Sequence, residues 1–590
     1  MMVRDWEMAC KSMQRVDNHG QKFVHDRNNK SNGESQMNTH VILAGRLPLA
    51  LAPSSPSRPA RRALAFATLA FCLAASRAPA VQTLYTNLAG GKWETTNNWL
   101  FGPPGPGQSI FISNSPSKTV IIDAVTASSA PSSLLISDLT LLAINPTTTN
   151  TLLLSNAGTN SPLTVTNVFT LGLGGALTLT NSALSLPGPS PIYSWSTQAA
   201  LCVDGPLSLN QTSLVTALAG RVLVDNVAGS SNGPITLNSG STLRFRLMIL
   251  GNAPGASSSL TLNSGTLAFP DSTNLLAIGS ATNASAAVTV NDGQLLGMEL
   301  SVGGQYSFFP QYLGGGPGGS GTLTVNGGDA QIRRTYVGAT KPGTLLVQGG
   351  TVEIVEMLRI GLQTNGTVCV TGGQLLATNA TYTGQDWVSV LVGNPGPGTL
   401  IVGSNGMVVA RYLNVGYSGG QTGTFTMDGG TVQVRSSLVV GDCPGGTVGN
   451  VTLNGGGLFV QNAGHTAVFD VRNGTVVLNP GATLTVDTLI LTNACSHFNC
   501  NGGTLIFNQL VLPPNAPPLR LKTGSSPLAS ALTLSWPSLY VGYCLQQSPD
   551  LSPWNWTPVY QTPMDDGTNR TVTISPSNSR MFYRICKPGN

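Results

Sequence analysis

The sequence predicts an all-β protein, a right-handed parallel β-helix followed by a small antiparallel β-sandwich. Three observations lead to this prediction: a short phrase recurs along the chain, residues alternate within each copy as they do in strands, and charge is scarce. Charged residues are 9% of the 590, against about 25% in an average soluble protein, and the 70 glycines favour strands and turns over long helices. The net charge of +5 is small for this length, which excludes the electrostatic footprint of a nucleic-acid-binding protein.

Residues 1–80 are expected to be absent from the mature chain. Residues 1–57 form a polar leader that we expect to be disordered, and a start codon assigned too far upstream would explain it. Residues 58–80 have the parts of a secretory signal: a basic start, an apolar run and the small-residue sequence Ala78-Pro79-Ala80. The apolar run is shorter than the roughly twenty residues that cross a bilayer. We therefore expect secretion or display at the cell surface, with no permanent membrane span in a mature chain that begins at Val81.

The segment 81–118 is expected to cap the first coil of the β-helix, because a solenoid has an apolar end that must be covered. Trp93 and Trp99 lie beside a Gly-Pro-rich run over 102–107 and are candidates for this role. Flat aromatic rings also suit the faces of sugars, so the alternative is that these two side chains bind a carbohydrate.

The repeated phrase has the form Gly-Thr-Leu-x-Val-x-Gly-Gly and closes on Leu-x-Val-Gly. Clear copies are GTLTVNGGDAQIRRTYVG from Gly321 and GTFTMDGGTVQVRSSLVVG from Gly423, and looser copies extend the pattern over 119–511. Copies begin roughly 22 to 35 residues apart, a spacing that is typical of repeat proteins.

Alternation within each copy predicts strands with one buried face. Leu323 and Val325 should face the core, while Thr322 and Thr324 face solvent. About three such runs fit in a copy, and each is too short to form a stable sheet alone. Stacked coils of a parallel β-helix supply the missing neighbours above and below each strand.

The turn after the first strand of each copy carries a side chain that could bond to its counterpart in the next coil. These residues are Asn238, Asn263, Asn291, Asn326, Asp428 and Asn454. In stacked coils each amide could bond the next one and form a ladder. The alternative is that Asn-Gly pairs mark β-hairpins, which would give an antiparallel sandwich or a propeller.

The copies over most of 230–510 resemble the β-strand repeats of large exported bacterial proteins, the autotransporter-associated and PEP-CTERM-type repeat proteins. The stretch AGGKWETTNNWLFGPPGPGQSIFI from Ala89 is similar to the Trp-rich segment that often precedes such repeats. The resemblance implies an exported β-helix and carries no catalytic residue. The chain departs from these families because it lacks their C-terminal run of long amphipathic strands and their Pro-Glu-Pro motif. We therefore expect neither self-translocation nor sorted anchoring.

The run LPPNAPPL over 512–519 predicts a Pro-rich linker, and residues 520–590 form a different unit. Its phrase Leu545-Gln546-Gln547-Ser548 and its closing Phe582-Tyr583-Arg584 resemble a small C-terminal β-sandwich module that is similar in outline to fibronectin-type domains.

Four cysteines are candidates for disulfide bonds in an oxidising compartment. Cys544 and Cys586 fall on expected strands of the C-terminal unit, and Cys495 could pair with Cys500. No spacing of cysteine and histidine matches a structural metal site, so we predict no metal and no cofactor.

Catalysis on a β-helix would need converging carboxylates, and the sequence does not place them together. Asp292 and Asp428 share a turn position but lie several coils apart, and the acids Glu353 and Glu356 have no counterpart in the next copy. We therefore predict no catalytic residue, although an enzyme stays an open alternative.

Five arginines in the second half of their copies could form a basic stripe that attracts acidic glycans. They are Arg333, Arg334, Arg359, Arg411 and Arg435. The competing interpretation is that these are solvated outward positions.

Two functions follow from these features. The first is a non-enzymatic exported solenoid that acts as a structural protein or adhesin at the cell surface. The second is a carbohydrate-active protein, either a lyase or glycosidase or a sugar-binding module. The expected partners are polysaccharides or cell-surface components, and the oligomeric state stays open.

Overall fold

The computed structural model describes residues 81–590 with gaps at 146, 189–198, 232, 272–273, 305–318, 379–388, 418, 420, 443–445, 494, 512–518, 524–531, 538–542, 553–554, 567–568, 576–580 and 587–590. The predicted leader, the predicted signal and most of the predicted linker lie outside the described residues.

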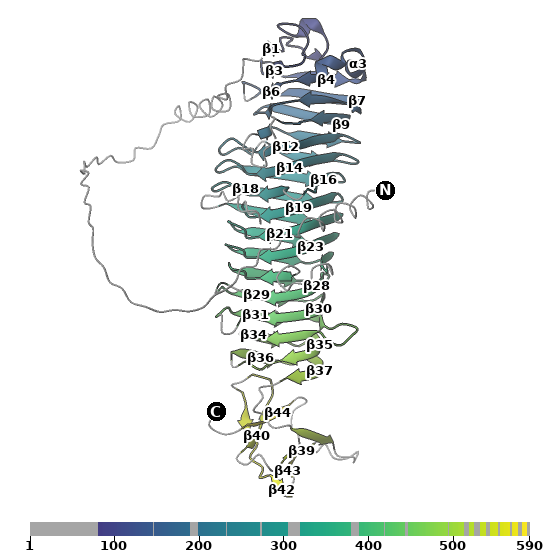
Figure 1. The fold of residues 1–590 in the computed structure, drawn as a ribbon. Coiled ribbons are helices and arrows are strands. Elements are labelled where there is room, and N and C mark those ends of the chain that lie inside the picture. The colour runs from purple at the N-terminus through teal and green to yellow at the C-terminus, as the bar shows by residue number, and fades with distance from the viewer. Residues whose placement is uncertain are drawn as a thin grey trace, which may run out of the picture. The chain divides into compact units, whose positions relative to one another are not determined.

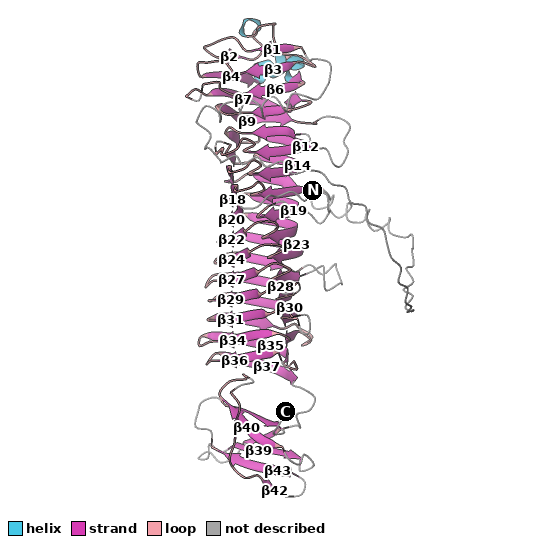
Figure 2. Ribbon diagram, turned by 90° about the vertical axis from the view of Figure 1, so that its left-hand side faces the viewer, coloured by secondary structure: helices cyan, strands magenta, loops and turns pink. Residues whose placement is uncertain are grey.

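The described chain up to residue 511 is a parallel β-helix, and each coil crosses three sheets, named here A, B and C (Figures 1 and 2). Neighbouring coils pair in parallel along every sheet. This confirms the predicted fold class and excludes the alternative of antiparallel hairpins for this part of the chain.

Sheet A is built from β2 (Gly91–Lys92), β4 (Lys118–Asp123), β7 (Asn150–Val165), β9 (Gly175–Ser185), β11 (Leu207–Asn210), β13 (Ile235–Leu237), β15 (Ser257–Leu262), β18 (Ser285–Val290), β20 (Ser320–Val325), β22 (Gly343–Val347), β24 (Gly366–Val370), β27 (Gly398–Val402), β29 (Gly423–Met427), β31 (Gly449–Leu453), β34 (Gly474–Leu478) and β36 (Ser496–Cys500).

Sheet B continues from the later parts of β7 and β9 through β12 (Leu214–Val224), β14 (Thr242–Leu250), β16 (Thr266–Phe269), β19 (Gln294–Val302), β21 (Asp329–Val337), β23 (Thr351–Ile360), β25 (Gln374–Ala377), β28 (Met407–Val415), β30 (Thr431–Val440), β32 (Gly456–Val460), β35 (Ala482–Ile490) and β37 (Thr504–Val511). The short β5 (Leu135–Ile136) pairs with the end of β7.

Sheet C contains β1 (Gln82–Leu84), β3 (Ser109–Ile112), β6 (Asp138–Leu141), β8 (Phe169–Leu171), β10 (Ala199–Val203), β17 (Leu275–Ile278), β26 (Ser389–Val392) and β33 (Val468–Val471). Between these, the long strands of sheet B bend round a corner and supply sheet C with their second halves, often with a shift in register at the bend. Side chains at this B–C corner therefore do not alternate regularly between the core and the outer face, as they do in a straight strand.

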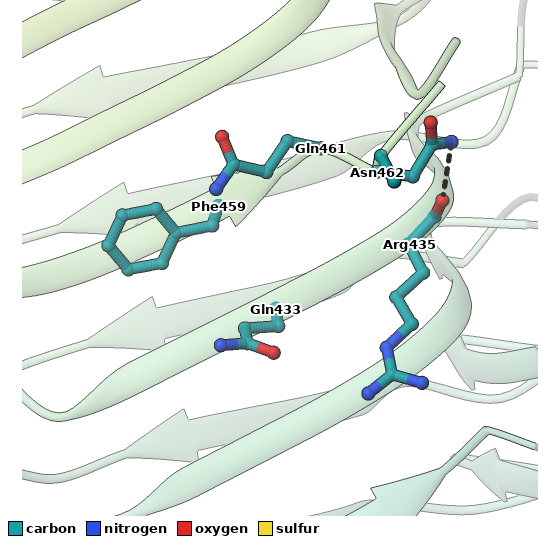
Figure 3. Close-up of a pocket in the computed structure, with 6 residues that line it drawn as sticks. Gln433, Arg435, Phe459, Gln461 and Asn462 are labelled. Carbon is teal, nitrogen blue, oxygen red and sulfur yellow. Dashed lines mark hydrogen bonds between the residues drawn. The ribbon is translucent and has the colours of Figure 1, made fainter. Parts of the chain in front are cut away.

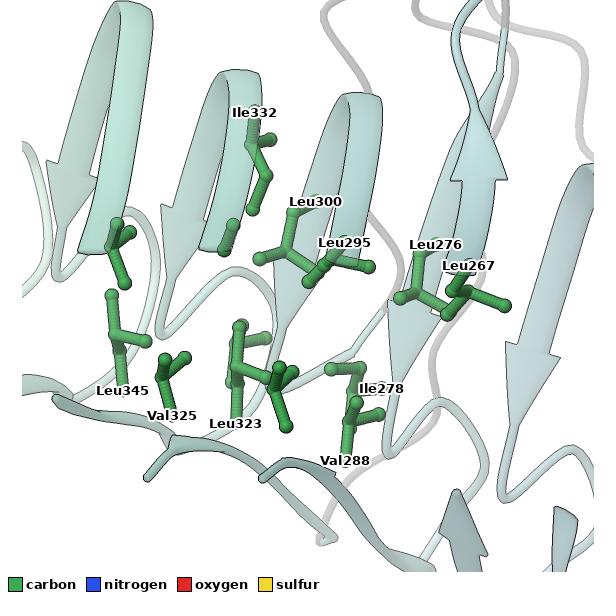
Figure 4. Close-up of a cluster of buried hydrophobic side chains, with 14 of the residues drawn as sticks. Leu267, Leu276, Ile278, Val288, Leu295, Leu300, Leu323, Val325, Ile332 and Leu345 are labelled. Carbon is green, nitrogen blue, oxygen red and sulfur yellow. The ribbon is translucent and has the colours of Figure 1, made fainter. Parts of the chain in front are cut away.

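The core follows the predicted alternation. Leu323 and Val325 of β20 are fully buried, whereas Thr322 and Thr324 are only half-buried on the outer face. Figure 4 shows side chains of sheet A meeting those of sheets B and C inside the coil, so one continuous apolar core runs through the stack. Full burial of each such side chain stabilises the fold by roughly 1.5–3 kcal/mol relative to exposure.

The stack begins earlier than expected. Strands β1 and β2 already pair with β3 and β4, so residues 81–118 form the first coil instead of a separate cap. A short helix, α3 (Ala124–Ser129), follows β4, and two 3-10 turns lie at Thr96–Asn98 and Pro131–Leu134. Asp123 begins α3 by accepting hydrogen bonds from the backbone amides of Val125 and Thr126.

The C-terminal unit is a small antiparallel sandwich, as predicted. One sheet contains β38 (Arg520–Thr523), β39 (Leu532–Pro537), β43 (Asn569–Ile574) and β42 (Met564–Asp565), and the other contains β41 (Thr557–Pro558), β40 (Cys544–Ser548) and β44 (Phe582–Cys586). Both sheets contribute to one core, formed by Leu534, Trp536, Leu545, Val572, Ile574 and Ile585.

Two acidic side chains are buried in neighbouring coils, directly after the paired strands β10 and β12. Asp204 and Asp225 are 4% and 0% exposed. Asp204 Oδ1 accepts hydrogen bonds from the backbone amides of Asn226 at 2.5 Å and Val227 at 3.0 Å. Burial raises the pKa of the Asp204 carboxyl from 3.8 to about 6, although the two amides lower it, and the Asp225 charge adds to the rise.

Replacing Asp204 with asparagine is expected to stabilise the protein at pH 7.5 by about 2 kcal/mol. The pKa of the Asp204 carboxyl is higher in the folded protein than in the unfolded chain, so the folded protein binds this proton more tightly. The free energy of unfolding therefore falls as the pH rises from about 4 to about 6. The amide keeps an oxygen for the two backbone donors and carries no charge. Denaturant unfolding at several pH values tests this: the advantage of Asp204→Asn should nearly vanish at pH 4, and a constant advantage would contradict it.

Candidate functional site

Trp93 and Trp99 lie in the core of the first coils, and their rings are 0% and 4% exposed. The two rings contact edge to face at 5.1 Å between centroids, and Tyr85 packs on Trp99 in the same way at 4.9 Å. Trp93 Nε1 donates to Ser133 O, and Trp99 Nε1 donates to Trp93 O. This burial contradicts the sugar-binding alternative, because neither ring has a face open to a ligand.

The predicted turn residues lie one above another along the stack, at the end of sheet A. Asn263 Nδ2 donates to Asn238 Oδ1 at 2.8 Å, and Asn291 and Asn326 continue the chain of amides at 2.9 Å each. A second run joins Asn454 to Asp428 at 2.7 Å.

The ladder also includes residues that the sequence did not single out. These are Asn210 before the first run, and Asn479 and Asn501 after the second. Between the two runs the turn position is occupied by Gln348, Thr371 and Gly403, so the amide ladder is interrupted there.

The five predicted arginines do not form one basic stripe. Arg334 is 8% exposed, and its guanidinium binds Glu356 at 2.5 Å and Glu299 at 3.2 Å. Arg333 also binds Glu356, which is 2% exposed. These two arginines are therefore neutralised within a buried ion network at the B–C corner, and the prediction of outward positions is wrong for Arg334.

The other three arginines differ in their surroundings. Arg359 Nε lies 3.1 Å from the sulfur of Met357, and the Arg411 guanidinium lies over the ring of Tyr412 at 5.3 Å from its centroid. Arg435 is exposed at the B–C corner. Its guanidinium makes no ion pair or side-chain hydrogen bond within the described part of the chain.

The structure brings one of the two predicted cysteine pairs together and keeps the other apart. Cys544 and Cys586 are directly opposite each other on β40 and β44, and the Cys544 thiol lies 3.6 Å from Cys586 O. Cys495 lies directly before β36, and Cys500 is the last residue of that extended strand. The strand from Ser496 to Cys500 alone spans about 13 Å at roughly 3.3 Å per residue, whereas a disulfide needs Cα atoms within about 7 Å. The predicted pairing of Cys495 with Cys500 is therefore wrong.

The outer surface near the C-terminal end of the stack has a shallow hollow of about 240 Å³, which we call the Phe459 groove (Figure 3). Two neighbouring coils form it, because Gln433 of β30 pairs in register with Phe459 of β32. Its lining residues are Gln433, Arg435, Phe459, Gln461, Asn462 and Ala463.

A loop over 461–467 forms one wall of this groove. In most neighbouring coils a single strand continues round the B–C corner, but here the loop separates β32 from β33. Asn462 organises the loop: its Oδ1 accepts from the Gly464 amide at 3.0 Å, and its Nδ2 donates to Arg435 O at 3.0 Å. The loop is thus fixed to the preceding coil.

Asp487 of the next coil holds the same loop from beneath. This side chain is 2% exposed and accepts from the amide of Asn462 at 3.0 Å, the amide of Ala467 at 3.2 Å and the imidazole of His465 at 3.1 Å. Burial alone would raise the pKa of the Asp487 carboxyl, but these hydrogen bonds outweigh it and hold the pKa below its ordinary 3.8. The carboxylate therefore stays charged and keeps the loop in place.

Chemically, the groove has one aromatic ring, one cation and three amide side chains, of which the Asn462 amide is used within the loop. Sequence analysis predicted only Arg435 of this set. Two signals were present: Phe459 stands at an outward strand position, and the stretch QNAGHTA interrupts the alternation of the copy that contains it. Neither signal could be interpreted without the register of the coils.

Comparison of the chain with protein-family models, curated proteins and solved structures finds no match. Among the residues that the structure describes, no helix has the length and the apolar character needed to cross a membrane.

Proposed function

We propose that the chain is an exported, non-enzymatic protein whose β-helix serves as a rigid support at the cell surface. The observation that carries this proposal is the unbroken parallel pairing of successive coils. The opening glycines of the repeats, for example, pair directly from coil to coil, Gly321 with Gly343, Gly343 with Gly366 and Gly366 with Gly398. Each coil therefore extends the inter-coil hydrogen bonds and the apolar core along one axis, which makes the stack rigid.

The outer face supports the same function. Outward positions of β20, β29 and β31 in sheet A carry serine, threonine or asparagine, and the turn ladder adds amides along one edge. Threonine recurs at an outward position of β22, β24, β27 and β34 as well, so the surface is hydrated with little charge. The sequence resemblance to exported bacterial repeat proteins and the signal-like segment 58–80 favour action outside the cytoplasm.

Export is tested by expressing the full chain and a variant without residues 58–80 in a bacterial host. We expect the full chain outside the cytoplasm, with Val81 as its N-terminus and sensitivity to protease added to intact cells. The deletion variant should remain inside. As a control, Ala80→Leu should be exported but not cleaved, because the cleavage site needs a small residue there. An unprocessed, cytoplasmic full chain would contradict the proposal.

A further inference from the structure

We infer that the Phe459 groove is a binding site for an acidic polysaccharide. The inference rests on the proposed function only in placing the protein outside the cell, where such polymers occur. It goes beyond that function because it names one site and the chemistry of its ligand.

The ring of Phe459 is positioned as a flat platform. A Cβ atom added to Gly457, two residues earlier on β32, would lie 2.6 Å from Cε2 of the ring and 2.8 Å from Cζ. The ring therefore lies against the backbone of Gly457, in the manner of an aromatic side chain that covers a strand glycine. Phe459 is half-buried and lines the groove, so the part of its ring that is turned to solvent can contact the C–H face of a sugar.

Polar groups surround this platform without internal partners. The amides of Gln433 and Gln461 and the guanidinium of Arg435 make no side-chain hydrogen bond within the described part of the chain. Figure 3 shows Gln433 and Arg435 on one coil and Phe459 and Gln461 on the next, all on the same side of the sheet. Amides suit hydroxyl groups, and a guanidinium can bind a carboxylate or sulfate through two parallel hydrogen bonds.

The charge of the site selects acidic ligands over neutral ones. The carboxylate of Asp487, which holds the loop of the groove, accepts hydrogen bonds from three donors of that loop. Arg435 therefore keeps its charge for a ligand. A single exposed cation is too little for a nucleic acid, whose affinity depends on many phosphate contacts.

The site is also preorganised, which reduces the conformational entropy lost on binding. Asn462 and Asp487 fix the loop, and Gln433 and Phe459 project from paired strands whose backbones are held by the stack. Strands in neighbouring coils are about 4.8 Å apart, so a chain of sugars can contact both coils at once.

Affinity electrophoresis and calorimetry with the mature full chain test this site, using polygalacturonate, dextran sulfate and uncharged dextran as probes. We expect binding to an acidic polymer and none to dextran. Phe459→Ala and Arg435→Gln should each weaken it by about tenfold or more, and Gln461→Ala, on the exposed loop, should weaken it with little risk to the fold. The two acidic probes distinguish a carboxylate from a sulfate as the recognised group.

The matched control is Arg411→Gln, which removes an arginine that stacks on Tyr412 one coil away. It should leave the affinity within about twofold. Equal weakening by Arg411→Gln and Arg435→Gln, with no effect of Phe459→Ala, would show unspecific charge attraction and overturn the inference. Absence of binding to both acidic polymers would overturn it too, while the export test would still decide the proposed function separately.

Discussion

Glu356→Ala is expected to destabilise the coils around β21 and β23 by about 3–5 kcal/mol, because it leaves buried charge without a partner. Glu356 is 2% exposed and binds both Arg333 and Arg334. Glu299 alone cannot neutralise two arginines, one of which is almost fully buried. Burial opposes the charge of Arg334, and the carboxylate of Glu356 outweighs that effect and raises the pKa of the guanidinium.

The matched control is Glu353→Ala, three residues earlier on the same strand. Glu353 is half-buried on the outer face and accepts one hydrogen bond from Gln331 at 2.7 Å. Its loss should cost less than about 1 kcal/mol. Hydrogen exchange of the amides in β21 and β23, together with the midpoint of thermal unfolding, measures both variants. Equal effects of the two substitutions would contradict the assigned role of the buried network.

Gly366→Ala is expected to destabilise the stack by about 3 kcal/mol or more, because the added methyl group has no room. A Cβ at this position would lie 2.3 Å from Val337 O and 2.3 Å from Gly361 N. Val337 ends β21, which belongs to the copy that begins at Gly321. These atoms belong to the backbone and cannot move aside cheaply. The opening glycine of the repeated phrase is thus required by close approach of main chains.

The control for this prediction is Gly105→Ala. Gly105 has open space where the Cβ would lie, and its φ is one that other residues adopt. We expect a change of less than about 0.5 kcal/mol there. Unfolding by guanidinium measures both substitutions, and a Gly366→Ala variant as stable as Gly105→Ala would show that the coils can separate locally at little cost.

Most of the solenoid could be predicted because its signal is repeated in every coil. The alternation of Leu323 and Val325 with threonines defines a buried and an outer face, and a short strand needs neighbours in adjacent coils. The turn asparagines lie in line for the same reason: once the coils stack in register, equal positions in the phrase become neighbours.

The B–C corner could not be predicted in the same way. The register shifts between Ile332 and Arg334. The alternation of buried and outward side chains in a straight strand therefore does not continue round the bend. Arg334 therefore turns toward Glu299 and Glu356, which lie on neighbouring coils and at no fixed sequence spacing.

The Phe459 groove could not be predicted for the same reason, because it depends on contacts between coils. It needs residues from two coils and a corner loop that hydrogen-bonds to Asp487 of a third. Sequence spacing identified neither the partners of Arg435 nor the ring beside it. For Trp93 and Trp99 the sequence left two roles open, a cap on the first coil and a sugar-binding platform, and only their burial in the first coils excludes the platform.

The measurement that tests the central claim most directly is incubation of the mature chain from Val81 with plant, algal and bacterial polysaccharides, followed by assay for new reducing and unsaturated ends. A non-enzymatic support with one binding groove predicts retention of the protein on acidic polymers and no new ends at any pH. Release of such ends, abolished by a substitution in the groove or at His465, would contradict it and show that the β-helix carries an active site.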